Sequence, residues 1–176
     1  IGDYYTGVSC YDGRNFKHYS AADGLAGNMV LTIIEDYREN LWFGCNGGVS
    51  KSDFKSDIPF INFTEENGLS GNSVRSLLED NEGNIWIGTS GSGLCKFSGD
   101  MFTYYYETDG IINHKVRSFT EDQDGNIWFA TEGGLSKLSP SLTFTNYTTN
   151  EGLPVNFVNV LFKDGKGNIW IGTPAG

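Results

Sequence analysis

The sequence has little positive charge and no long apolar segment, and both shortages limit what the protein can do. Its 176 residues contain 12 lysines and arginines against 22 aspartates and glutamates, so the net charge is −10. A nucleic-acid backbone requires clustered basic residues, and a nucleic-acid partner is therefore not expected. No apolar run approaches the roughly 20 residues of a membrane span, so membrane attachment would need segments outside this sequence. The sequence opens on Ile1 without a signal-peptide pattern, and we interpret it as an excised segment.

Cysteine and proline are also scarce. The three cysteines, Cys10, Cys45 and Cys95, form no Cys-x-x-Cys metal pair, and their odd number leaves at least one thiol unpaired. We therefore expect no disulfide framework and interpret the cysteines as buried, inert thiols. The four prolines contrast with 24 glycines, and aromatic residues make up 14% of the chain. This composition predicts an all-β protein with many tight turns.

A regular repeat organises the chain. Four tryptophans are separated by 44, 42 and 42 residues; a glycine stands 18 residues before each of them and an aspartate six residues before. Spacing this regular indicates repeated structural units. The repeating positions are Trp42, Trp86, Trp128 and Trp170, with Gly24, Gly68, Gly110 and Gly152, and with Asp36, Asp80, Asp122 and Asp164.

Each unit is predicted to contain four short strands. In the second unit they cover residues 74–79, 85–89, 94–98 and 102–106, which are rich in β-branched and aromatic residues and separated by Gly, Asp and Asn. The turn between the first two strands contains a glycine, which supplies a positive φ. Glu39 stands at this position in the first unit, so that turn should differ. The turn glycines of the other units are Gly83, Gly125 and Gly167.

Four strands per repeat predict a β-propeller built of four-stranded antiparallel blades. A helical solenoid is excluded because no apolar stripe of helical period is present, and a parallel β-helix has shorter rungs than this repeat. We interpret residues 1–176 as a single β-propeller segment with repeats at about 24–67, 68–109 and 110–151. Half-blades at 1–23 and 152–176 would together complete a fourth blade, and the whole would be part of a larger propeller.

One run of residues is shared, with small changes, by the repeats. It reads Glu79-Asp80-x-x-Gly83-Asn84-Ile85-Trp86-Ile87-Gly88-Thr89, with Gly93-Leu94 behind it and Gly68-Leu69 ahead of it. With this run the chain resembles, over essentially its whole length, the two-component regulator propeller family. In that family the repeats build the extracytoplasmic sensor of hybrid histidine kinases, usually in seven-bladed propellers, and many members are thought to sense oligosaccharides. The resemblance implies a ligand-binding sensor on the periplasmic or extracellular side of a bacterial membrane protein.

Propellers usually bind ligands where the loops between blades meet the loops between second and third strands. There the repeats place an amide or imidazole before each first strand and, in two units, an arginine three residues later. Amides and guanidinium groups bond sugar hydroxyls or carboxylates, and aromatic rings stack on sugar faces. The candidate ligand-binding residues are Tyr4, Tyr5, Asn72, Arg75, His114, Arg117, Glu132 and Asn156.

Structural roles compete with this hypothesis at the same positions. An asparagine that recurs before a strand often bonds its own backbone in a turn. Arg75 and Arg117 could pair with Glu79, with Glu121 or with a neighbouring blade.

Signals of catalysis are weak. The sequence has no nucleophile elbow, no His-Glu-x-x-His motif and no phosphate-binding glycine loop, and it implies no catalytic residue or cofactor. The acidic turns at Asp80 and Asp122 lack the spacing of a calcium loop, so we interpret them as turn formers and expect no metal. His114 with Glu132 could imitate the His and Glu pair of streptogramin-type lyases, which is one alternative function, and a protein-interaction scaffold is another. The leading hypothesis is a sensor that binds an oligosaccharide without turnover, and the chain could form a homodimer.

Overall fold

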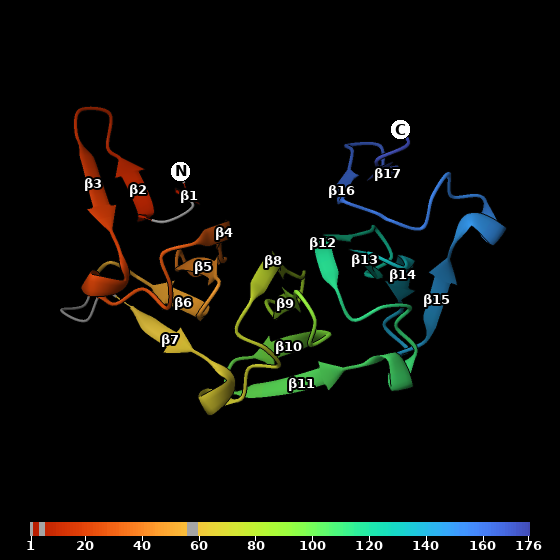
Figure 1. Ribbon diagram of the computed structural model, residues 1–176, viewed down its shortest axis with the longest axis horizontal. Helices are drawn as coiled ribbons and strands as arrows, with labels where there is room; N and C mark the ends of the chain where they lie inside the picture. The colour runs from red at the N-terminus through yellow and green to blue at the C-terminus, as the bar shows by residue number, and fades with distance from the viewer. Residues whose placement is uncertain (1, 4–5, 56–59) are drawn as a thin grey trace.

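The computed structural model describes residues 2–3, 6–55 and 60–176, and most of the regular structure in them is β. The strands form antiparallel sheets that follow one another in an arc (Figure 1). Three of these sheets have four strands each, which confirms the predicted blade. Within each blade the strands pair in the order of the sequence, so every connection is a hairpin.

The three complete blades have the same plan. The first contains β4 (Val30–Glu35), β5 (Leu41–Cys45), β6 (Gly48–Ser52) and β7 (Ile61–Phe63). The second contains β8 (Val74–Glu79), β9 (Ile85–Thr89), β10 (Leu94–Ser98) and β11 (Met101–Tyr105). The third contains β12 (Val116–Glu121), β13 (Ile127–Thr131), β14 (Gly134–Leu138) and β15 (Phe144–Tyr147). Only β11, which begins and ends one residue early, departs from the strands predicted for the second unit.

Incomplete sheets lie at both ends of the arc. One contains β1 (Gly2–Asp3), β2 (Gly7–Tyr11) and β3 (Phe16–Tyr19), and the other contains β16 (Val160–Lys163) and β17 (Ile169–Gly172). Figure 1 shows these two sheets on opposite sides of the opening of the arc, so they do not complete one blade between them. The arc in Figure 1 stays open, because its two end sheets do not meet. The chain is therefore a partial propeller.

One aspartate organises the turn between the first and second strands of each repeat. In the second blade Asp80 Oδ1 accepts hydrogen bonds from the backbone N–H groups of Glu82 (3.0 Å) and Asn84 (2.8 Å), and Oδ2 accepts from Trp86 Nε1 (2.8 Å). Protein donors thus satisfy the carboxylate, which confirms the turn-forming role. The tryptophan bond recurs in Asp36 (2.8 Å), Asp122 (2.7 Å) and Asp164 (2.9 Å).

The first repeat makes the same turn although a glutamate replaces the glycine. The φ angle is 81° at Gly83 and 65° at Glu39, and both N–H groups donate to the carbonyl of the turn aspartate, over 2.9 and 2.8 Å. The prediction that this turn would differ is therefore wrong. The aspartate bonds hold Glu39 in a left-handed conformation that costs an L-residue about 1–2 kcal/mol.

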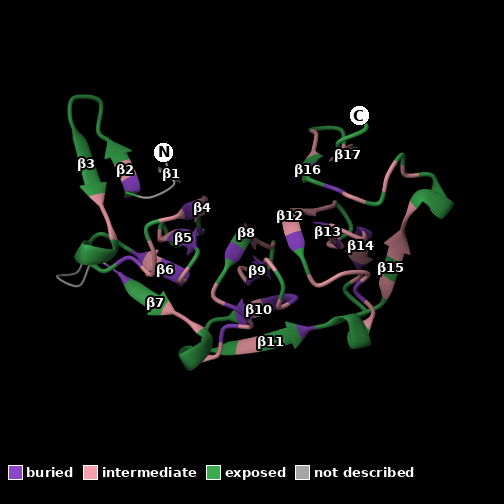
Figure 2. Cartoon of the chain, viewed as in Figure 1, coloured by how far each residue is buried: buried purple, intermediate pink, exposed green. Residues whose placement is uncertain are grey.

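The tryptophans of the second strands pack in the seams between blades. Trp42 is 2% exposed and its ring lies 5.7 Å from that of Phe97 in the next blade. Trp86 is also buried and shares a core cluster with Leu138 of the blade after it. Trp170 has no following blade and is 62% exposed. Figure 2 shows buried residues on the inner strands and exposed residues along the outer strands β3, β7 and β11, so the core is a series of seams.

A short 3-10 turn opens each crossing from an outer strand to the next blade. Each turn ends at a glycine whose φ lies between 97° and 119°, a region that other residues avoid. This conformation explains the glycine that stands before every tryptophan. No helix in the described part of the chain is long and apolar enough to cross a membrane. The turns are η1 (Ala21–Asp23), η2 (Glu65–Asn67), η3 (Glu107–Asp109) and η4 (Thr149–Glu151).

Candidate functional site at the seam between the second and third blades

Backbone hydrogen bonds between neighbouring blades assemble one loop face. Gly93 N–H, in the loop after β9, donates to the carbonyl of His114 in the crossing to the third blade (3.0 Å). Similar bonds join Gly7 N–H to the Asn28 carbonyl (2.9 Å) and Val158 N–H to the Thr131 carbonyl (3.0 Å). The loops after the second strands therefore lie beside the crossing loops, as the sequence predicts.

The recurring asparagine of the crossing loops has a structural role. Its side-chain oxygen accepts a hydrogen bond from the backbone N–H seven residues earlier, at the start of the 3-10 turn. This is the turn-forming alternative considered for these positions, so Asn72 and Asn156 shape the loop face from within. The bond joins Asn28 to Ala21 (2.7 Å), Asn72 to Glu65 (2.8 Å) and Asn156 to Thr149 (2.8 Å).

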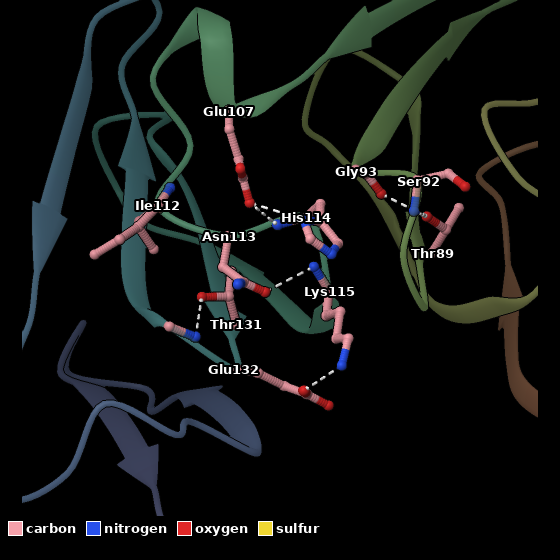
Figure 3. Close-up of polar contacts among 12 residues, drawn as sticks. Thr89, Ser92, Gly93, Glu107, Ile112, Asn113, His114, Lys115, Thr131 and Glu132 are labelled. Carbon is pink, nitrogen blue, oxygen red and sulfur yellow. Dashed lines mark hydrogen bonds and ion pairs between the residues drawn. The ribbon is translucent and has the colours of Figure 1, made fainter.

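His114 takes the place of this asparagine in the third crossing and makes a different contact. Its Nδ1 lies 2.8 Å from Glu107 Oε1, and its backbone N–H donates to the same oxygen (3.1 Å). Figure 3 shows Glu107 reaching down to His114 while Glu132 points to Lys115. The His114–Glu132 pair considered for a lyase is therefore not formed, because each residue bonds a different partner.

β-Bulges bring the two predicted arginines to one seam. The register between β8 and β9 shifts between Val74 and Ser76, so Arg75 is the extra residue. The register between β12 and β13 shifts in the same way around Arg117. A bulge leaves its extra residue outside the ladder and re-aims the side chain. Both arginines consequently line the same cavity.

Lys115, Arg117 and Glu132 form an ion-pair network in this cavity. Glu132 Oε2 accepts a hydrogen bond from Lys115 Nζ (3.0 Å), and Oε1 accepts from Arg117 Nη1 (3.1 Å). The hydrogen bond from Lys115 lowers the pKa of Glu132, and the charges of Lys115 and Arg117 lower it further. The guanidinium of Arg117 also lies over the ring of Phe157, 4.8 Å from its centre. Glu132 is thus ionised at neutral pH and holds both cations in place.

Arg75 joins the cluster through a hydroxyl group. Its Nε donates to Ser90 Oγ (2.9 Å), and Ser90 forms an isolated β-bridge with Lys115 of the next blade. The pairing of Arg75 or Arg117 with Glu79 or Glu121 is not observed, because each of those carboxylates accepts a backbone N–H from the preceding blade. Arg117 instead pairs with Glu132, a carboxylate of its own blade.

The cavity at this seam has a volume of about 160 Å³. Larger grooves of about 400 and 300 Å³ lie on the turn side of the seams, beside Trp86 and Trp42, and none of the predicted ligand-binding residues lines them. The small cavity is the one that gathers predicted site residues from two blades. Its lining is Arg75, Ser90, Lys115, Val116, Arg117 and Glu132.

Two polar residues of this site, Lys115 and Ser90, were not predicted from the sequence, nor was the apolar Val116. Lys115 lies between two predicted residues, and its position beside the first strand was a usable signal. Ser90 carries no such signal, since its roles come from the hydrogen bond with Arg75 and the bridge to Lys115, which only the structure shows. Tyr4 and Tyr5, predicted to stack on a sugar, lie outside the described residues.

Neither the thiols nor the acidic side chains offer a second chemical centre. Burial raises the pKa of Cys45 to about 11 and also raises that of Cys95, so both thiols stay protonated at neutral pH. The prediction that all three thiols are buried is wrong for Cys10, which is exposed on the edge sheet. Within residues 2–3, 6–55 and 60–176, no three His, Cys, Asp or Glu side chains are grouped to hold a metal ion.

Comparison with known proteins adds to this geometry. The family model described as two component regulator propeller matches residues 24–47, 68–91, 110–133 and 152–175. The structure is similar to the extracellular domain assigned to the hybrid two component system BT3049 of B. thetaiotaomicron, with a TM-score of 0.85 and 27% identity. That match covers 98% of this chain and 24% of the other, so this chain spans about a quarter of that domain.

Two more distant structures show the fold alone. The extracellular domain assigned to the hybrid system BT4673 of B. thetaiotaomicron has a TM-score of 0.76 and 23% identity, over 90% of this chain and 24% of that one. A virginiamycin B lyase from Staphylococcus aureus has a TM-score of 0.69 and 12% identity, over 92% of this chain and 54% of that one. A search of curated proteins gave no match.

Proposed function

Because this chain belongs to the two component regulator propeller family, we propose that it is part of the ligand-binding sensor of a two-component signalling protein, on the periplasmic or extracellular side of a bacterial membrane. The observation that carries the proposal is the polar cavity on the loop face, where side chains of two blades converge. A concave site with a few convergent polar groups is the usual form of a small-molecule site.

The proposed ligand is an oligosaccharide that is bound without chemical change. Guanidinium, ammonium, carboxylate and hydroxyl groups at the cavity supply both donors and acceptors for sugar hydroxyls. The cavity is smaller than the roughly 300–1,000 Å³ of a site that encloses a whole drug-sized ligand. One sugar unit would therefore enter it, and the remaining units would lie along the loop face.

The seam location suits a sensor, because a ligand there contacts two blades at once. Arg75 and Ser90 belong to the second blade, whereas Lys115 and Glu132 belong to the third. A ligand that binds one relative placement of the blades better than another shifts the population toward it. Such a shift is the signal that a sensor would pass on to the rest of the protein.

Native mass spectrometry with a panel of neutral and acidic oligosaccharides tests the proposal. We expect an adduct of one oligosaccharide, recovered unchanged after incubation, and a His114→Ala variant that still binds. Recovery of a sugar of altered mass, lost in His114→Ala, would indicate a lyase. A folded protein that forms no adduct with any member of the panel would contradict the proposal, and the same spectra report whether the chain forms the proposed homodimer.

A further inference from the structure

We propose that the cavity between the second and third blades binds an anionic group, a carboxylate or a sulfate, that is carried by the sugar ligand. This inference rests on the proposed function and specifies the class of sugar. It is argued from the charges around the cavity, the geometry of Arg75 and the size of the space.

The local charge opposes that of the whole molecule. Arg75, Lys115 and Arg117 contribute three positive charges, and Glu132 contributes one negative charge, so the cavity lining carries a net charge of +3 − 1 = +2. The chain as a whole has a net charge of −10. A positive site within a negative surface attracts an anionic ligand, and Glu132 is the one acidic side chain among the residues that line it.

The charge belongs to this seam and not to the repeat. At this seam, four aligned positions of the repeat hold Arg75, Ser90, Lys115 and Arg117, of which three are basic. At each neighbouring seam, the same four positions hold only one basic residue. A repeat that needed cations here for packing would show them at every seam. The aligned sets are Leu31, Asn46, Ser73 and Arg75 at the preceding seam, and Arg117, Glu132, Phe157 and Asn159 at the following one.

Arg75 is positioned to receive the anion. Its Nε is bonded to Ser90 Oγ, which fixes the direction of the guanidinium plane. Glu132 is already shared between Lys115 and Arg117, and among the described residues Arg75 has no carboxylate partner and no partner for its terminal nitrogens. A planar guanidinium with its two terminal NH2 groups open matches two oxygens of a carboxylate or sulfate.

The size of the cavity also fits a single anionic group. A volume of about 160 Å³ equals about five water molecules, since each occupies about 30 Å³ in the liquid. A carboxylate or sulfate with part of its sugar ring fills such a space, while further sugar units stay outside.

Binding measurements with charged and neutral sugars test this inference. The probes are trigalacturonate, its methyl ester, κ-neocarrabiose sulfate, which carries sulfate and no carboxylate, and the neutral maltotriose. Isothermal titration is done on the native protein, on Arg75→Gln and on Arg14→Gln, a matched loss of one charge in the exposed β2–β3 hairpin. Thermal unfolding of each variant shows whether it is folded.

We expect one of the two anionic probes to bind, with affinity that falls as salt is added. Arg75→Gln should weaken it about tenfold or more, because a charge-assisted hydrogen bond contributes that much. Arg14→Gln should bind within about twofold of the native protein. If trigalacturonate binds and its methyl ester does not, the anionic group is a carboxylate. If κ-neocarrabiose sulfate binds, the anionic group is a sulfate.

Three results would overturn the inference. If only maltotriose or the methyl ester binds, the sensor function stands and the anion site is wrong. If an acid binds but Arg75→Gln leaves its affinity unchanged while the variant is folded, the acid binds elsewhere. If no probe here and no sugar of the wider panel binds, the proposed function fails together with the inference.

Discussion

At the scale of single residues, the turn aspartates carry the most hydrogen bonds of any recurring position. Asp122 accepts four hydrogen bonds: two from the backbone N–H groups of Asp124 and Asn126, one from the side-chain amide of Asn126, and one from Trp128 Nε1 (2.7 Å). Burial raises the pKa of Asp122, but these hydrogen bonds to the ionised carboxylate outweigh it, and the pKa lies below its ordinary value of 3.8. The same balance lowers the pKa of Asp36. The ionised form is therefore part of the folded turn.

An Asp122→Asn substitution should lower the stability in a pH-dependent way. The folded pKa is the lower one, so the stabilisation is complete above about pH 4 and is lost as the pH falls through the folded value. We expect the free energy of unfolding to drop by about 2 kcal/mol at pH 7, the value of a hydrogen bond to a charged group. The difference should shrink toward pH 2, as measured by urea unfolding at several pH values.

Asp124→Asn is the control for this experiment, because Asp124 lies in the same turn with an exposed side chain. If Asp122→Asn lowers the free energy of unfolding equally at pH 7 and pH 2, the role of the ionised carboxylate is contradicted.

At the scale of elements, the strands were predictable and their irregularities were not. β8, β9 and β10 match the predicted ranges, because hairpin turns with Asp, Asn and Gly fix strand ends locally. The bulges at Arg75 and Arg117, which recur at Leu31 in the first blade, depend on pairing with the second strand, so the first strand read alone does not show them. Three of the predicted residues, Arg75, Arg117 and Glu132, line the cavity, whereas the Ser90–Lys115 bridge and the shared use of Glu132 could be found only from the seam itself.

A matched pair of serines tests how the first strands of neighbouring blades are joined. Ser118 Oγ accepts a hydrogen bond from the backbone N–H of Leu161 in the next blade (3.1 Å). Ser76 occupies the same position one repeat earlier, is buried, and its Oγ has no hydrogen-bond partner in the described structure. Ser118→Ala should cost about 1–2 kcal/mol because it leaves an N–H unpaired, whereas Ser76→Ala should be neutral or slightly stabilising.

Chemical denaturation of the two variants under the same conditions is the measurement. If Ser76→Ala and Ser118→Ala lower the free energy of unfolding equally, then packing of the serine, and not the hydrogen bond across the seam, stabilises these strands.

At the scale of the whole molecule, the open arc leaves one apolar sheet face uncovered. Phe162 of β16 and Trp170 of β17 are directly opposed, so their side chains lie on one face, and they are 65% and 62% exposed. In the complete blades the aligned face packs against the next blade. The sequence predicts that the two half-blades together make up a fourth blade, but whether they meet depends on the angle at every seam, which no single repeat encodes.

When these 176 residues are prepared alone, we expect this face to cause self-association that increases with protein concentration. Phe162→Ser and Trp170→Ser should shift the sedimentation of the protein toward the monomer. Met101→Ser is the control, because Met101 is equally exposed but lies on the outer strand β11. If the two end-face variants sediment like the native protein while Met101→Ser alone dissociates it, association involves the outer strands instead.

The packing of the tryptophans also bears on how such a chain is inherited. Each repeat brings a tryptophan of its own and, on its third strand, the residue that covers the preceding tryptophan, Phe97 for Trp42 and Leu138 for Trp86. A duplicated gene segment of one repeat length therefore encodes a blade that already fits both of its new neighbours. Lineages can lengthen or shorten such an array by whole copies through unequal recombination.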